Sequence, residues 1–159
     1  MAFDLRKLSF GGPAAIVASM ALIVGLDAAT AARATVVTSL LIIGVADNLT
    51  DSLSVHIYQE TERLAERQAF RTTVANFFTR IGVTFTFVLL FLFFPTAVAV
   101  YMCVLWGFIL LSGLSGLIAR FRGASIILEI CKHAAVAIVV IAFSKALGVW
   151  IPALMASSG

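Results

Sequence analysis

Long apolar runs separated by short polar segments make up most of this chain. A helix needs about 20 apolar residues to cross the hydrocarbon core of a bilayer. On that basis the pattern predicts five spans, at residues 8–26, 34–58, 74–95, 97–119 and 125–151. Residues 81–119 contain no charged side chain, which is more than one span requires, and Pro95 predicts a break between two helices there. We therefore predict an all-α polytopic membrane protein that forms one membrane domain over residues 1–159.

The first apolar run also has features of a secretory signal peptide, because Arg6 and Lys7 precede it and small residues follow it. The run is long enough for a complete span, so we interpret it as the first transmembrane helix. Small residues recur along it at steps of three and four, which predicts close contact with another helix, either as ordinary packing or as a seam that lines a pore or joins a dimer. These residues are Gly11, Ala14, Ala18, Ala21 and Gly25.

The composition agrees with a membrane protein, since 62% of the 159 residues are hydrophobic and 12% are charged. The two cysteines, Cys103 and Cys131, have no CxxC spacing, so neither a disulfide framework nor a zinc ribbon is indicated. The net charge is +3, but in a membrane protein the positions of lysine and arginine indicate topology first and a ligand only second. Nucleic acid binding is not indicated.

Basic residues are distributed unevenly between the two sides of the five predicted spans. One side holds Arg6, Lys7, Arg63, Arg67, Arg71, Arg80, Arg120, Arg122 and Lys132, and the other holds Arg33 and Lys145. Cytoplasmic loops carry the excess of basic residues, so the amino terminus is predicted to be cytoplasmic and the carboxyl terminus outside or lumenal. Arg80 is expected to snorkel toward the surface from the start of the third span. We expect a bacterial inner membrane protein.

Residues 44–62 place an unusual number of polar side chains on a helix whose first half is apolar. At about 100° per residue, one face carries oxygen-bearing side chains within about 80°, namely those of Asp47, Asp51, Ser54, Tyr58 and Glu62. The opposite face carries His56, Glu60, Arg63 and Arg67. Ionisable residues inside a span are costly and usually functional. The charged pattern keeps helical spacing, which predicts that this second helix projects into water to about Arg67.

Asp47 and Asp51 lie one turn apart, with neither lysine nor arginine nearby in sequence. Two ionised carboxylates this close repel each other unless a proton or a cation intervenes, which favours metal or proton binding. The alternative is that they cap the helix or pair with Asn48, Thr50 and Ser52.

Two other sets of polar residues could bind a metal or could interact only with their neighbours in sequence. His56 and Glu60 form a one-turn pair that suits a transition metal or an ion pair with Arg63, and the glutamates of this segment also fit a solvated face. A further set, Glu129, Cys131 and His133, suits a soft metal, although residues one turn apart at a helix start more often interact locally.

The order of these parts resembles the vacuolar iron transporter family of Fe²⁺ and Mn²⁺ transporters. Residues 44–47, Gly-Val-Ala-Asp, are similar to that family's G-L-A-E, and Leu53-Ser54-Val55 followed by Glu60 is similar to its I-S-M followed by a glutamate. Residues 116–148 resemble its basic turn and small-rich last helix. The resemblance implies five spans, a cytoplasmic amino terminus and a homodimer.

The chain departs from the family pattern at three places. The first helix of the family carries an N-D-G element, but this chain has Pro13 and Ala14 near that position. The methionine of the second helix is Val55 here, and the cytoplasmic metal-binding domain is reduced to about residues 59–73. Asp51 lies outside the usual pattern and is a candidate replacement for the missing carboxylate.

The resemblance implies a transporter that moves Fe²⁺ or Mn²⁺ out of the cytoplasm by proton exchange. Asp47 and Asp51 would bind the metal, Ser54 and Tyr58 would add neutral oxygens, and Glu60 and Glu62 would collect cations at the cytoplasmic mouth. The alternative is a non-transporting transmembrane subunit of a larger complex that retains the fold. We expect no enzymatic activity, since no nucleophile, base and orienting group can be assembled, and we expect no cofactor beyond the transported metal.

Overall fold

The computed structural model describes residues 12–61 and 66–157, and these form five helices. The helices are α1 (Gly12–Ala28), α2 (Arg33–Thr61), α3 (Glu66–Phe93), α4 (Thr96–Arg122) and α5 (Ile126–Ser157). No strand occurs in the described residues, so the all-α prediction is confirmed.

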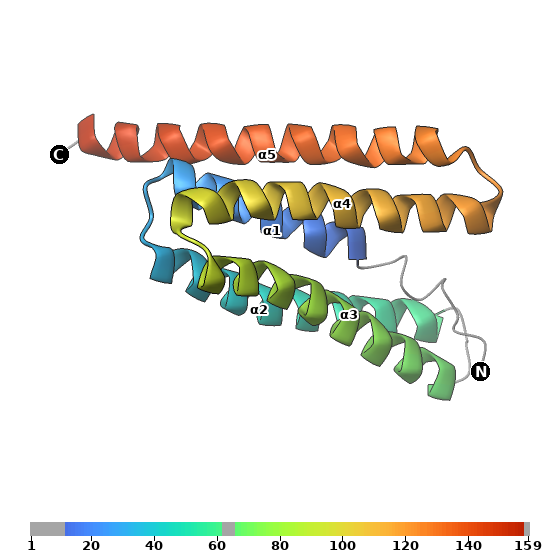
Figure 1. Ribbon diagram of the computed structural model, residues 1–159. Helices are drawn as coiled ribbons and strands as arrows, with labels where there is room; N and C mark the ends of the chain where they lie inside the picture. The colour runs from blue at the N-terminus through green and yellow to red at the C-terminus, as the bar shows by residue number, and fades with distance from the viewer. Residues whose placement is uncertain (1–11, 62–65, 158–159) are drawn as a thin grey trace.

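The helices are arranged in two groups that α1 connects. Figure 1 shows α5, α4 and α1 together on one side of the molecule, with the α2 and α3 pair on the other. The α1 helix contacts each of the other four helices, and Ile16, Met20 and Ile23 on it are almost completely buried. The short first helix is therefore the centre of the bundle.

Four helices, α2 to α5, are long and apolar enough to cross a membrane, and α1 is a shorter apolar helix of 17 residues. These elements are compatible with an integral membrane protein and match four of the five predicted spans. The predicted first span begins at residue 8, and its first residues lie outside the described part of the chain. The sidedness of the two termini stays a prediction.

Two predicted helix boundaries in the first four helices can be compared with the structure. The break at Pro95 is confirmed, because α3 ends at Phe93 and α4 begins at Thr96. The predicted projection of the second helix to Arg67 is wrong, since α2 ends at Thr61 and Arg67 belongs to α3. A charged, helix-favouring sequence extends either neighbouring helix equally well, so its pattern does not locate the reversal of the chain.

The last helix also extends further than predicted. Pro152 lies inside α5, which continues to Ser157 instead of ending near residue 151. Proline removes one backbone hydrogen bond from a helix but does not always end it, particularly in apolar helices. Between α4 and α5, Gly123 adopts a left-handed conformation with φ of 66°, which closes the end of α4.

The α2 and α3 helices are antiparallel, and their contacts fix a simple register. Gly44 lies opposite Thr84, whose Cγ2 atom would be 2.8 Å from a Cβ atom at Gly44. One turn further along, Asn48 on α2 bonds Arg80 on α3. The two pairs have the same sum of residue numbers, as expected for an antiparallel pair. The register brings the polar half of α2 against the first half of α3.

The small residues of the first helix pack partly within the chain. Gly25 lies against α5. A Cβ atom built on Gly25 would lie 3.2 Å from the carbonyl oxygen of Ser144, and the carbonyl oxygen of Gly25 lies next to Gly148. Ala21 is buried, whereas Ala14 and Ala18 are exposed. The seam predicted from the sequence is thus divided between an internal contact and an open surface.

Candidate functional site

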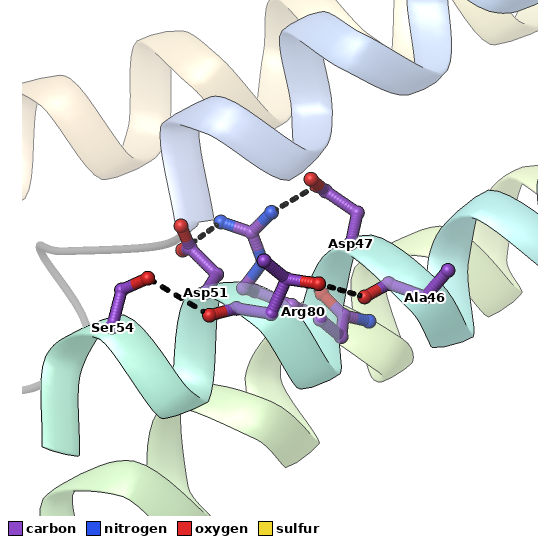
Figure 2. A network of polar contacts seen from close by, with 7 residues as sticks. Ala46, Asp47, Asp51, Ser54 and Arg80 are labelled. Atoms are coloured by element: carbon purple, nitrogen blue, oxygen red, sulfur yellow. Dashed lines mark hydrogen bonds and ion pairs between the residues drawn. The ribbon is translucent and has the colours of Figure 1, made fainter. Parts of the chain in front are cut away.

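The side chain of Arg80 joins α3 to three residues of α2, and Figure 2 shows its contacts with two of them, Asp47 and Asp51. Its Nε atom donates to Oδ1 of Asn48 at 2.6 Å, and its Nη1 atom donates to Oδ2 of Asp51 at 2.5 Å. Its Nη2 atom forms an ion pair with Oδ2 of Asp47. The guanidinium is therefore bonded on all three of its nitrogen positions by residues of one helix face.

Arg80 does not snorkel to the surface, because its side chain is only 2% exposed. The prediction of a surface position was wrong. Asn76, Arg80 and Thr84 follow each other at intervals of four residues, so they lie on one face of α3, and all three are buried. A buried arginine is tolerated when its charge and its N–H groups have partners. The carboxylates of α2 provide those partners.

The side chains of Asp47 and Asp51 are partly exposed, whereas that of Arg80 is buried. Their side chains are 50% exposed for Asp47 and 41% exposed for Asp51. Each bonds Arg80 through its Oδ2 atom, which leaves the Oδ1 atom of each outside the pairing. Two ionised carboxylates and one guanidinium give this cluster a formal charge of −1. One additional positive charge, from a proton or a cation, would make it neutral.

The structure brings together only part of the predicted ligand set. Asp47 and Asp51 meet through Arg80, but the Ser54 hydroxyl donates to the backbone carbonyl of Thr50 at 3.0 Å. Tyr58 lies on the exposed surface further along α2. The side chain of Glu60, and the whole of Glu62, lie outside the described residues. Among the residues that are described, no group of three His, Cys, Asp or Glu side chains is placed to hold a metal ion.

The alternative interpretations of these residues are also partly resolved. Asn48 joins the aspartates, as one alternative held, but it does so through Arg80. The hydroxyl of Thr50 donates to the backbone carbonyl of Ala46 at 2.9 Å, and so it is bonded within its own helix. The positive charge that the structure places between the two carboxylates is the guanidinium of Arg80, from another helix, and the binding of a metal ion or a proton there stays a prediction.

The set at the start of α5 is not gathered into one site. Glu129 bonds Lys132 at 3.0 Å, and Nδ1 of His133 lies 2.8 Å from the Ser115 hydroxyl of α4. Cys131 is an exposed free cysteine, and the described residues contain no metal-binding group of three that includes it. These local interactions account for the polar residues of this region.

Asn76, Arg80 and Thr84 are buried polar residues of α3 that were not assigned to the site from the sequence. Their signal is the four-residue spacing of Asn76, Arg80 and Thr84 in an otherwise apolar helix, which matches the spacing of Asn48 and Ser52 on α2. Two polar faces of equal spacing on neighbouring antiparallel helices are expected to meet.

The fold and this site define an all-α protein with helices suited to a bilayer and a buried charge cluster between two of them. Comparisons with protein-family models, with curated proteins and with solved structures find no match for the chain. The resemblance to the vacuolar iron transporter family thus depends on the sequence motifs described above.

Proposed function

We propose that this chain is a membrane transporter that moves Fe²⁺ or Mn²⁺ out of the cytoplasm in exchange for protons. The observation that carries the proposal is the unequal burial of the charge cluster, in which Asp47 and Asp51 are about half exposed and their partner Arg80 is enclosed. Carboxylates that keep an accessible side inside an apolar helix are suited to receive a proton or a cation.

Arg80 changes how such an exchange would proceed. Two unit charges about 4 Å apart at an effective dielectric constant of about 20 interact by about 4 kcal/mol, so a divalent ion beside the guanidinium meets a repulsion of roughly 8 kcal/mol. A metal ion bound between the carboxylates therefore competes with Arg80 for them. In this proposal Arg80 holds the aspartates when no metal is present and moves aside when the metal binds.

Protons supply the other half of the exchange. With both aspartates ionised the cluster is charged −1, and one proton on either aspartate makes it neutral without any movement of Arg80. A neutral cluster is less costly in a poorly hydrated site. We therefore assign the protonated cluster to the return step of the transport cycle.

The test is uptake of Fe²⁺ and Mn²⁺ into proteoliposomes across a proton gradient. We expect uptake by the parent protein and its loss in Asp47→Asn and in Asp51→Asn. Asp27→Asn serves as the matched control, because Asp27 is an exposed aspartate near the end of α1, on a helix other than the one that carries Asp47 and Asp51. Absence of uptake by the parent at any gradient would reject the transporter.

A second candidate is a non-transporting subunit that docks in a larger membrane complex. The exposed apolar surface of α5 favours it, because only Ala137 is buried within this fully described helix and Phe143 and Trp150 are largely exposed. In this candidate the Arg80 cluster serves to hold α2 against α3. Purification from native membranes in mild detergent distinguishes the two, since a subunit co-purifies in fixed proportion with other proteins and a homodimeric transporter does not.

A further inference from the structure

A small cavity lies where α1, α2 and α3 meet, next to the charge cluster. Its volume is about 20 Å³. Four of the residues that line it carry polar side chains, and these are Ser19 of α1, Asp47 and Asn48 of α2, and Thr84 of α3. Apolar side chains such as Leu22, Leu40 and Ile43 form the rest of the wall.

One polar side chain at this cavity, that of Asn48, has a buried hydrogen-bond donor without a partner in the described residues. Asn48 is 1% exposed, and its Nδ2 atom has no hydrogen-bond partner. The bond from Arg80 to Oδ1 fixes which end of the amide is which, so Nδ2 is a donor. Ser19 and Thr84 are also buried. An unsatisfied buried donor costs roughly 1–3 kcal/mol, so a partner is expected.

We propose that this cavity binds one ordered water molecule that connects the first helix to Asp47. A water molecule needs roughly 10–15 Å³ of such space and about two to four polar partners, and the cavity meets both requirements. The water accepts a hydrogen bond from Nδ2 of Asn48 and donates one to the carboxylate of Asp47. The hydroxyls of Ser19 and Thr84 complete its coordination.

The same geometry argues against a metal ion at this position. The Asn48 Nδ2 atom is a hydrogen-bond donor and would face a cation with its positive end. Arg80 already occupies Oδ1 of the same amide, so Asn48 cannot turn its oxygen to a cation without losing that bond. A neutral molecule that both donates and accepts hydrogen bonds fits all four side chains.

The role of the water rests on the proposed function. In proton exchange, Asp47 must gain and lose a proton while Arg80 remains enclosed on its α3 side. The water gives Asp47 a polar neighbour on the α1 side that donates a hydrogen bond to the ionised carboxylate and accepts one from the protonated carboxyl, so both forms of Asp47 are stabilised while the Ser19 hydroxyl holds the water in place. Ser19 is then the contribution of the first helix to the exchange site.

A structure of the parent protein at a resolution that reveals ordered water tests the site directly. We expect water density within hydrogen-bonding distance of Nδ2 of Asn48 and the Asp47 carboxylate. Thr84→Val keeps the shape of the side chain and removes its hydroxyl, and we expect weaker water density and a lower midpoint of thermal unfolding. Ser112→Ala, on α4 outside the lining, is the control and should change neither.

Ser19→Ala and Thr84→Val should lower the unfolding midpoint by less together than the sum of their separate shifts, because both lose bonds to the same water. A direct bond from Nδ2 of Asn48 to Ser19 or Thr84, with no water density, would overturn the site. An unfolding midpoint that rises with Na⁺ but not with choline would indicate that the cavity binds a cation, and this result would also overturn the proposed water site.

Transport measurements separate this inference from the proposed function. Slower proton-driven uptake by Thr84→Val, with metal binding unchanged, supports the role of the water. Unchanged uptake, with the water density lost, would refute that role. If the parent protein has no uptake but shows the water, the proposed function and the proton role fail together while the water site stands.

Discussion

Arg80 of α3 donates from Nε to the side-chain oxygen of Asn48 of α2 at 2.6 Å, in the interior of the bundle. The bond orients the guanidinium so that its two other nitrogens point to Asp47 and Asp51 (Figure 2). Asn48 is uncharged, but its hydrogen bond therefore helps to position the charged guanidinium between the two carboxylates. The cluster behaves as a unit, and its members are expected to respond to substitution together.

Removal of Arg80 should destabilise the protein. Arg80→Met keeps much of the side-chain volume but leaves two carboxylates without their cation, and because both are about half exposed the cost should be smaller than the roughly 3–5 kcal/mol of breaking a fully buried pair. We expect a lower midpoint of thermal unfolding in detergent. Arg33→Met is the control, because exposed Arg33 makes a single bond to the carbonyl of Leu92. An equal loss in both variants would contradict a special role for Arg80.

Single and double substitutions of the aspartates should have opposite effects on stability. Asp47→Asn leaves one carboxylate for Arg80 and makes the cluster neutral, so the unfolding midpoint should stay the same or rise. Asp47→Asn combined with Asp51→Asn leaves the guanidinium without a carboxylate, and the midpoint should fall. Thermal unfolding of all three variants measures this, and a steady decrease with each substitution would show that the charge balance is not what matters.

Gly148 should be the most sensitive glycine in the contact between α1 and α5. A Cβ atom at this position would overlap the carbonyl oxygen of Gly25 and lie 2.9 Å from Cβ of Ala28, so Gly148→Ala should lower the unfolding midpoint. Gly113→Ala is the matched control, because no atom lies within 4 Å of the added Cβ. There alanine should gain roughly 0.5–1 kcal/mol from its greater helix propensity.

The exposed part of the first helix should take part in a dimer if the chain is a homodimer. Ala18 is exposed, so Ala18→Phe should weaken dimerisation by preventing close helix contact. Cross-linking and analytical ultracentrifugation in detergent measure the change. Ala135→Phe, at an exposed position of α5, is the control. A dimer that persists unchanged in Ala18→Phe would place the contact elsewhere.

The length and spacing of the apolar runs were sufficient to predict the helices. Backbone hydrogen bonds within an apolar run are satisfied locally by a helix, so the run alone predicts the element. Pro95 likewise located the break between α3 and α4, because its missing N–H and fixed φ act on the chain locally. The end of α2 was predicted less well, since a charged segment favours helix on both sides of the reversal.

The composition of the site was decided by tertiary structure. Asp47 and Asp51 were identified from the sequence because ionisable residues in an apolar helix are costly wherever they lie. Their partner Arg80 is 29 residues or more from them, and only the antiparallel packing of α2 against α3 brings it between them. The sequence by itself determined that two carboxylates needed a positive charge, because their repulsion depends on local spacing. Which charge satisfies them was decided by packing, because contacts between helices depend on how the faces of separate segments meet.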